Sequence, residues 1–311
     1  RLIYGQTLVS GNIVFMHVTG AKNQYLHLVV VVAGHEVEEL GDIYFGDELI
    51  PISGNASTGR TAGYVRINKK RGVAGDVADA DLVAETGGIW TSAHKLGGCA
   101  YLVARLQWSA DIFPNGIPAI KCVVKGKKVY DPRSGLTAYS ANSALCAADY
   151  LHDSTWGKGV AQARIRSADL IEAANICDED VTLDDATTEN RYETHGTIDA
   201  NQRPSSILTD LAGAMAGCIV DTGGTWTVRA GAHRTSTVTL TDADLVGGFS
   251  VQPRQSRQDT FNRIRGVYVS PDNQWAPADL PATAQERAGA WAAADQLLRG
   301  VLTQGNAANA G

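Results

Sequence analysis

The chain has 311 residues, of which 44% are hydrophobic and 19% charged, and its formal net charge is −6. This composition supplies enough apolar side chains for buried cores and excludes an intrinsically disordered chain. The acidic balance argues against a protein that grips nucleic acid through a basic surface, and the length suggests two or three domains.

Residues 1–112 are expected to form a strand-rich domain. Short runs of apolar, often β-branched residues alternate with Gly, Asn and Asp, which is typical of strands joined by turns. The expected strands cover residues 12–18, 25–32, 37–49 (as a hairpin or meander), 64–67 and 101–113. The glycine-rich stretch 71–98 is predicted to be a long connection with a short helix near 79–85. The longest apolar run, residues 26–33, is shorter than the roughly 20 residues that span a bilayer.

Residues 113–203 are expected to form an inserted α+β domain. Two strands, 120–125 and 127–130, flank Gly126 and predict a hairpin whose tip is the basic run 125–128. After a turn over residues 131–135, Asn142 or Ser143 is placed to cap a helix that continues to Leu151. Ser167 is predicted to cap the next helix, over residues 168–177.

Residues 204–282 are expected to form a second strand-rich domain, followed by a terminal helix and flexible tail over 283–311. Pro204 is placed to begin a helix that Gly217 ends. Further strands are expected at 218–221 and 225–229, which form a hairpin, and at 235–240 and 261–269. Thr283 and Glu286 form a capping box for the last helix, whose apolar stripe contains Trp291, Ala294, Leu298 and Val301.

The cysteines and acidic clusters are predicted to be structural. Cysteine is found at five widely spaced positions without a C-x-x-C pair, which indicates buried thiols and argues against a disulfide framework or a zinc site. These positions are Cys99, Cys122, Cys146, Cys177 and Cys218. The acidic stretch 178–185 is expected to be a solvated loop, with a loose ion site left open, because Leu183 occupies the position where a calcium loop needs Gly. Asp242 and Asp244 are expected to cap a helix N-terminus.

The searched motifs for catalysis and cofactor binding are incomplete. His35 and Glu36 begin a zinc-protease motif, but Glu39 stands where the second histidine is needed. Gly157-Lys158-Gly159 begins a dinucleotide loop, but Gln162 replaces its third glycine. No P-loop or G-x-S-x-G elbow occurs in the sequence. We therefore assign no catalytic, cofactor-binding or metal-binding residue, and we expect a protein that is not an enzyme and uses no cofactor.

An ordered series of short segments resembles a known family of phage proteins. The segments are GIPAI (116–120), VKGKKVYDPR (124–133), TAYSANSALC (137–146), DYL (149–151), AANICD (173–178), RYE (191–193), GTI (196–198), LAGAMAG (211–217), GGTW (223–226), RAG (229–231), NRI (262–264), GVY (266–268) and DLP (279–281). In this order they resemble the hub region of the lambda-type tail-tip attachment protein, also called host-specificity protein. The resemblance covers residues 1–280, is strongest over 116–270 and weakens after Pro281.

The resemblance implies a central hub at the distal tip of a long, non-contractile tail. Such a hub is a homotrimer in which β-barrel-like ring domains, with inserted helices, match the hexameric tail tube. It contacts other tail-tip and tail-tube proteins and the tape-measure protein, and DNA passes through its lumen without specific binding. Host receptor contact is expected through regions outside this sequence, because family members are longer, so we expect a fragment of a longer chain. The strands near 13–18 and 26–32 are expected in a barrel wall.

Two alternatives remain open at this point. A tail-associated polysaccharide or cell-wall hydrolase would need two carboxylates in one cleft, and these partners can lie far apart in sequence. A monomeric carbohydrate-binding adhesin would need exposed aromatic platforms. The tryptophans are dispersed and are expected mainly in cores. They are Trp90, Trp108, Trp156, Trp226, Trp275 and Trp291.

Overall fold

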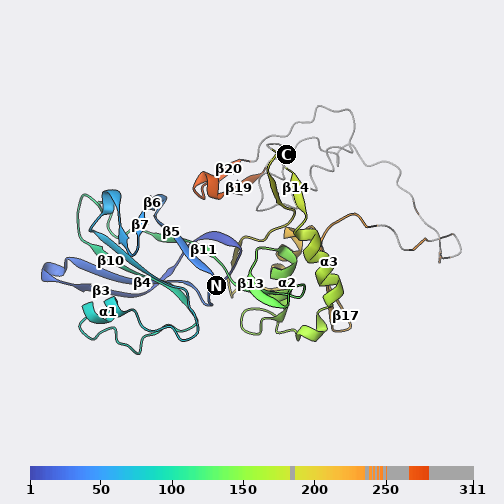
Figure 1. Cartoon of the computed structure of the whole chain (residues 1–311), viewed down its shortest axis with the longest axis horizontal. Coiled ribbons are helices and arrows are strands. Elements are labelled where there is room, and N and C mark those ends of the chain that lie inside the picture. The colour runs from blue at the N-terminus through green and yellow to red at the C-terminus, as the bar shows by residue number, and fades with distance from the viewer. Residues whose placement is uncertain are drawn as a thin grey trace.

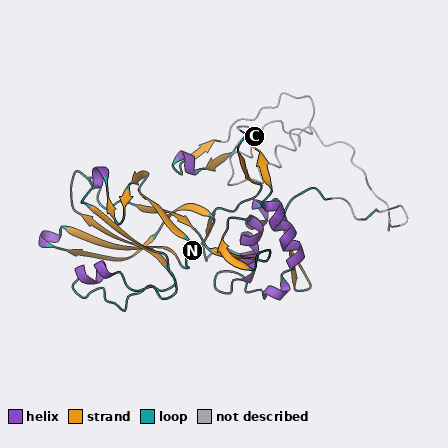
Figure 2. Cartoon of the chain, viewed as in Figure 1, coloured by secondary structure: helices purple, strands orange, loops and turns teal. Residues whose placement is uncertain are grey.

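In the computed structural model, the chain folds into two lobes with the N-terminus between them (Figure 1). The structure describes residues 1–182, 186–234 and 266–279, and also the single positions 238, 239, 241, 244, 246, 247 and 250. The first lobe is built mainly from strands and the second combines helices with short strands (Figure 2). The strand-rich α+β class predicted from the sequence is confirmed.

The first lobe contains two antiparallel sheets. The six-stranded sheet has the order β3 (Asn12–Thr19), β4 (Tyr25–Ala33), β10 (Ala100–Gln107), β9 (Val65–Lys70), β8 (Ala56–Ser57) and β7 (Ile52–Ser53). The four-stranded sheet has the order β2 (Gln6–Ser10), β11 (Ile120–Lys125), β5 (Glu39–Phe45) and β6 (Glu48–Ile50). The strands expected at 12–18, 25–32 and 64–67 and the 37–49 hairpin are therefore confirmed, and the strand expected over 101–113 ends at Gln107.

Alternating side chains on the central strands fill two different cores, because successive residues of a strand point to opposite faces. Leu28 and Val30 of β4 pack in a core shared by the two sheets. Val29 packs on the other face with Leu82 and Trp90. Leu82 belongs to α1 (Ala80–Glu85), the short helix expected in the glycine-rich connection, and Asp79 caps it by accepting from the Leu82 N–H at 3.0 Å. The six-stranded sheet is thus buried on both faces over its centre.

The chain passes between the two sheets at each side of the lobe. Ser10 ends β2 and Asn12 begins β3, with Gly11 between them, while Pro51 separates β6 from β7. A Cβ at Gly11 would lie 2.5 Å from Val30 Cγ1, so this corner requires glycine. The two sheets have no strand pairing in common, and in the described residues they form an open sandwich. The strands expected in a barrel wall form one side of the six-stranded sheet, where β3 is the edge strand.

The predicted hairpin around Gly126 is wrong. β11 pairs with β2 and β5, whereas β12 (Lys128–Asp131) pairs with β13 (Leu136–Tyr139). Gly126 therefore lies where the chain passes from one lobe to the other, and its N–H donates to the Gly5 carbonyl at 2.7 Å. A Cβ here would approach the Ile3 carbonyl oxygen to 2.2 Å. The glycine permits a close approach of two backbones and makes no turn.

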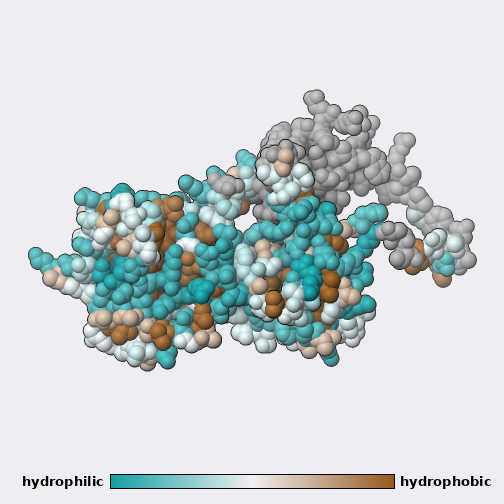
Figure 3. All heavy atoms as spheres, in the orientation of Figure 1, coloured by the Kyte–Doolittle hydropathy of each residue, from teal (hydrophilic) through white to brown (hydrophobic). Residues whose placement is uncertain are grey.

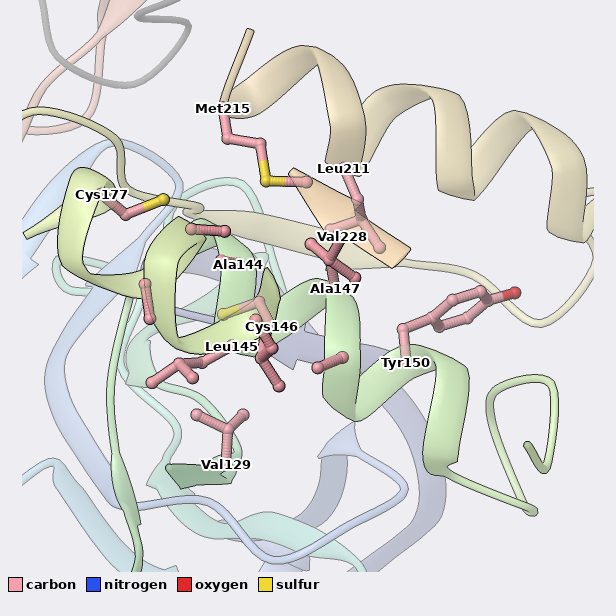
Figure 4. Packing of buried hydrophobic residues seen from close by; sticks show 14 of the residues in the cluster. Val129, Ala144, Leu145, Cys146, Ala147, Tyr150, Cys177, Leu211, Met215 and Val228 are labelled. Atoms are coloured by element: carbon pink, nitrogen blue, oxygen red, sulfur yellow. The ribbon is translucent and has the colours of Figure 1, made fainter. Parts of the chain in front are cut away.

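The second lobe packs its helices around one core. The helices are α2 (Ser143–His152), α3 (Ser167–Cys177) and α4 (Pro204–Ala214). Besides β12 and β13, the short strands here are β1 (Leu2–Tyr4), β14 (Asp180–Thr182), β15 (Thr188–Asn190), β16 (Gly196–Ile198), β17 (Cys218–Thr222) and β18 (Thr225–Arg229), which pair as β1–β16, β14–β15 and β17–β18. Two further strands, β19 (Val267–Val269) and β20 (Pro277–Asp279), pair with each other and contribute no residue to this core. Figure 4 shows Ala147 of α2 near Leu211 of α4 and Val228 of β18, while Leu145 lies on the other side of α2, toward Val129 of β12.

Two of the predicted helix ends of the second lobe are confirmed and two differ. The Asn142 side chain accepts from the N–H groups of Ala144 and Leu145 and caps α2, and Pro204 is the first residue of α4. Ser167 is not a cap, because it is the first residue of α3 and Arg166 precedes it without a capping side-chain bond. α4 ends at Ala214, before the expected end at Gly217.

The buried cores divide the described chain close to Gly126. The core between the sheets uses residues up to Val124, and the core of the second lobe begins again at Val129 and includes α4 and β18. The domain boundaries inferred at 112, 203 and 282 stay predictions. The helix and tail expected over 283–311 and the strand expected over 235–240 lie outside the described residues, apart from positions 238 and 239, and of the strand expected over 261–269 the structure describes β19.

Candidate assembly interface

The outermost strand β3 presents an uncharged, largely apolar edge. Its eight residues, Asn12–Thr19, include no Asp, Glu, Lys, Arg or Pro. Ile13, Val14, Met16 and Val18 are 49%, 53%, 51% and 43% exposed. β3 pairs with β4 on one side, and its other side has no strand partner among the described residues. Such an edge offers free N–H and C=O groups to another strand.

The register of β3 explains why these apolar side chains are exposed. Ile13, Met16 and Val18 are opposite Val30, Leu28 and Leu26 of β4, on the face that the four-stranded sheet covers elsewhere. A bulge between Ile13 and Phe15 inserts Val14 as an extra residue. The six-stranded sheet is wider than the sheet that covers it, so its core-type face continues onto the surface at β3.

A groove next to β3 continues this apolar surface. Its volume is about 330 Å³, and its lining includes Met16, Val18, Leu106, Trp108 and Ile117. Trp108 is 65% and Ile117 48% exposed. Figure 3 shows hydrophobic atoms in several patches on the first lobe, which is at the left in that view. The exposed apolar side chains of β3 and this groove together form a candidate surface for association with another protein.

The exposure of Trp108 corrects the expectation that it packs in a core. β10 ends at Gln107, so Trp108 no longer belongs to the alternating pattern of a strand. Its backbone N–H donates to the Gln24 carbonyl at 2.8 Å, which fixes the backbone while the side chain stays exposed. The turn-forming residues that follow, Ser109 to Gly116, were the available signal in the sequence. Trp90 is buried as expected.

The N-terminal strand β1 joins the two lobes. Leu2 and Tyr4 pack in the core of the second lobe, whereas Ile3 packs in the core between the two sheets. The Ile3 N–H donates to His35 Nε2 of the first lobe at 3.0 Å. The Gln6 N–H donates to His195 Nδ1 of the second lobe, also at 3.0 Å. Each of these ring nitrogens must be unprotonated to accept, and burial lowers the pKa of His35.

A charged cluster beside β1 strengthens the same junction. Lys127 Nζ donates to Asp149 Oδ2 at 2.7 Å and to Asp153 Oδ2. The Tyr4 hydroxyl donates to Asp149 at 2.5 Å. Burial works to raise the pKa of Asp153, but hydrogen bonds from Lys127 and from backbone N–H groups lower it overall. All three side chains of the ion-pair cluster have partners in the described structure, so the cluster is suited to holding the lobes together.

A second charged cluster fastens α1 to the six-stranded sheet. Arg66 donates to both carboxylate oxygens of Glu85, at 2.8 and 2.6 Å, and Arg105 donates to Glu85 at 3.1 Å. Burial works to raise the pKa of Glu85, but the bonds from Arg66 lower it overall. His27 lies 3.7 Å from Glu85, and burial lowers the pKa of this imidazole. Glu85 is thus bound to two guanidinium groups and is a poor general base.

The residues singled out for chemistry in the sequence lie in structural contacts. His35 holds β1, and Glu36 pairs with Lys128 at 3.1 Å. In the described part of the acidic stretch, Asp178 pairs with Arg133 and Glu179 with Arg191, both at 2.8 Å. Residues 183–185 of that stretch and Asp242 lie outside the described residues. Among the described residues, no group of three His, Cys, Asp or Glu side chains is placed to hold a metal ion.

The cysteines are free thiols. Cys122, Cys146 and Cys177 are buried, as expected for small apolar residues, while Cys99 is half-buried and Cys218 exposed. Burial raises the pKa of Cys122 and of Cys177 to about 12, so these thiols are unreactive near neutral pH. Among the described residues, no helix is long and apolar enough to cross a membrane.

Comparison with known proteins finds a family match by sequence and a similar solved structure. Residues 203–311 match the family described as "Putative phage tail protein". The fold is similar to that of a chain in the solved structure "Virion of native gene transfer agent (GTA) particle", with a TM-score of 0.56 and 18% sequence identity. This similarity covers 93% of the present chain, which spans 65% of the length of the virion chain. No curated protein sequence matches. The C-terminal third thus matches a family model of putative phage tail proteins, and most of the chain has a fold similar to that of a chain in a virion particle.

Proposed function

We propose that the chain is a structural component of a phage tail tip: the central hub that connects the tail tube to the host-recognition fibre. In this proposal it is a homotrimer of the virion, assembled in the host cytoplasm, at the distal end of a long non-contractile tail. It meets tail-tube and tape-measure proteins, and DNA leaves through its lumen. The match of residues 203–311 to a phage tail family carries the proposal, and the fold similarity to a virion chain supports it.

Two physical features support a rigid ring subunit around a DNA channel. β1 contributes to both cores, and the Lys127 cluster adds ion pairs at the same place, so the lobes are held as one unit. A rigid subunit can transmit force between neighbours without a hinge. The net charge of −6 would not hold DNA in a lumen by attraction to phosphate, so the genome could slide past.

Immunogold labelling of intact virions tests this function. Antibody raised against the chain and viewed by electron microscopy is expected to label the distal tail tip alone. Antibody against a known capsid protein of the same virions is the control, since it must label heads and leave the tip bare. Label on heads or along the whole tail shaft would overturn the proposal, as would virions that contain the chain but carry no label on tips made accessible by mild detergent.

A monomeric carbohydrate-binding adhesin is the second candidate, because exposed Trp108 beside the groove is the kind of platform that stacks on sugar rings. Binding of host-envelope glycans that is lost in Trp108→Ala, by a chain that stays monomeric, would favour the adhesin. The hydrolase gains no support from the described cavities. The cavity near α4 contains one carboxylate, Asp210, the cavity near Trp226 contains Asp221, and the groove near Trp108 contains none.

A further inference from the structure

The second lobe also has an uncharged strand edge, β13. β13 pairs with β12 on one side and has no strand partner on the other among the described residues. Its four residues, Leu136 to Tyr139, carry no charge and no proline, and the first three are exposed. Leu136 is 65% exposed, and Tyr130 on the neighbouring strand is 42% exposed. This hairpin therefore offers both free backbone groups and apolar side chains.

Natural edge strands avoid pairing by charge, proline, extreme shortness or a covering segment. β6 contains Glu48 and β17 contains Asp221. β2 is uncharged, but it packs close to β16 and its Ser10 carbonyl accepts from Arg1. β19 is uncharged and exposed but three residues long. β3 and β13 lack these protections over eight and four residues, apart from the bulge at Val14 in β3.

We propose that β3 of one copy of the chain pairs with β13 of the next copy. The proposal rests on the proposed function, in which the chain is a ring subunit. The two edges lie on different lobes, so their pairing is heterologous: each copy uses one surface as donor and a different surface as acceptor. Repeated contacts of this kind close into a ring when the rotation between copies permits it, whereas pairing of β3 with β3 would stop at a dimer.

The chemistry of the two edges favours β13 of a second copy as the strand that pairs with β3. A charged strand beside β3 would leave its charges against Ile13, Met16 and Val18, and burying an unpaired charge is costly. β13 is uncharged and brings apolar side chains of its own. Strand addition supplies main-chain hydrogen bonds, and pockets for alternate side chains supply specificity. The groove lined by Met16, Val18 and Trp108 is open beside β3 and is the pocket for apolar side chains of the incoming hairpin.

Chemical cross-linking of the whole chain tests the pairing. The background carries Cys99→Ser and Cys218→Ser, which remove the thiols that are not buried. A chain with both Met16→Cys and Leu136→Cys is treated with a short bismaleimide, whose reach covers small differences in register. We expect linked dimers and trimers on a denaturing gel and a trimer by light scattering. Chains with either cysteine alone are expected to remain single on the gel.

Three results would overturn the pairing: linking by Met16→Cys alone, linking of Met16→Cys to Val267→Cys on β19 in place of Leu136→Cys, or a chain that stays monomeric at high concentration. The cross-linking result and the antibody-labelling result can be told apart, so either proposal can fail alone. If the antibody labels the tail tip but no link forms between β3 and β13, the hub function stands and the pairing is wrong. If the link forms but the label lies elsewhere on the virion, the pairing stands in a different assembly.

Discussion

His35 accepts a hydrogen bond from the backbone N–H of Ile3 at 3.0 Å, so a histidine of the first lobe holds the strand that helps to fill the second. The other ring nitrogen, Nδ1, lies 2.6 Å from the Glu36 carbonyl oxygen and carries the proton that it donates to it. The imidazole must therefore be neutral in this arrangement, and a proton added at Nε2 would face the Ile3 N–H.

Stability is expected to fall as the pH is lowered, in part through His35. Burial lowers the pKa of His35 from 6.5 in the folded chain, so the unfolded chain binds a proton first as the pH falls. The stabilisation that neutral His35 contributes is therefore complete above its pKa in the unfolded chain, and it is lost as the pH falls toward its pKa in the folded chain. In His35→Gln, an amide oxygen can accept from Ile3 without titrating. Between about pH 7 and about pH 5, denaturant unfolding should show a smaller loss of unfolding free energy in this variant than in the unchanged chain. An equal loss in both would contradict the role of His35.

Lys127→Met is expected to destabilise the chain by about 2 to 4 kcal/mol, because it leaves Asp149 and Asp153 close together without their cation. These carboxylates are only 14% and 12% exposed, so water compensates little. The control is Lys125→Met, which removes an exposed pair with Glu39 and should change stability little. Urea unfolding measures the free energy of unfolding of both variants. Similar losses in Lys127→Met and Lys125→Met would show that the cluster does not stabilise the junction.

Gly126→Ala is expected to cost about 2 to 4 kcal/mol, since its Cβ would lie 2.2 Å from the Ile3 carbonyl oxygen and the backbone must move. Gly213→Ala is the matched control. Gly213 lies on the exposed side of α4, where an added Cβ meets nothing within 4 Å. That change should stabilise by about 0.5 to 1 kcal/mol. Thermal unfolding that ranks the two variants in the opposite order would contradict the close approach of the backbones.

Met16→Lys is expected to weaken self-association by about tenfold or more while the monomer stays folded, because it places a charge on the apolar edge of β3. Met16 is already 51% exposed, so the monomer core is spared. Thr58→Lys adds the same charge at an exposed site on a different part of the first lobe. Analytical ultracentrifugation over a range of concentrations compares the two, and equal association of both variants would exclude β3 from the interface.

Local structure could be predicted from sequence where neighbouring residues determine it. The apolar, β-branched runs of β3 and β4, the cap at Asn142 and the proline that begins α4 all act within a few residues. Pairing between distant strands could not be predicted in the same way. Gly126 has the sequence signature of a hairpin, but its N–H donates to Gly5, directly after β1 and more than a hundred residues earlier in the chain.

The candidate interface was only partly predictable for a related reason. The apolar strands near residues 13–18 and 26–32 were predicted, but both were expected in a barrel wall, and β3 instead lies at the edge of an open sheet. Exposure of Met16 and Val18 depends on how far the four-stranded sheet extends, which is a property of the folded lobe. Trp108 is exposed because β10 ends one residue earlier, and strand ends are the least certain part of a pattern-based prediction.

The pairing of β1 with β16 also sets an order for folding. Tyr4 pairs with Gly196, so the ladder joins the beginning of the chain to a segment that a ribosome releases nearly two hundred residues later. Closing so long a loop carries a large entropic cost, and contacts of this separation form slowly. The strands of the first lobe can form most of their pairings before then. Leu2 and Tyr4 become buried only after the helices of the second lobe have formed. Docking of β1 is therefore a late step, and until it happens a nascent subunit keeps apolar side chains exposed and depends on protection from aggregation.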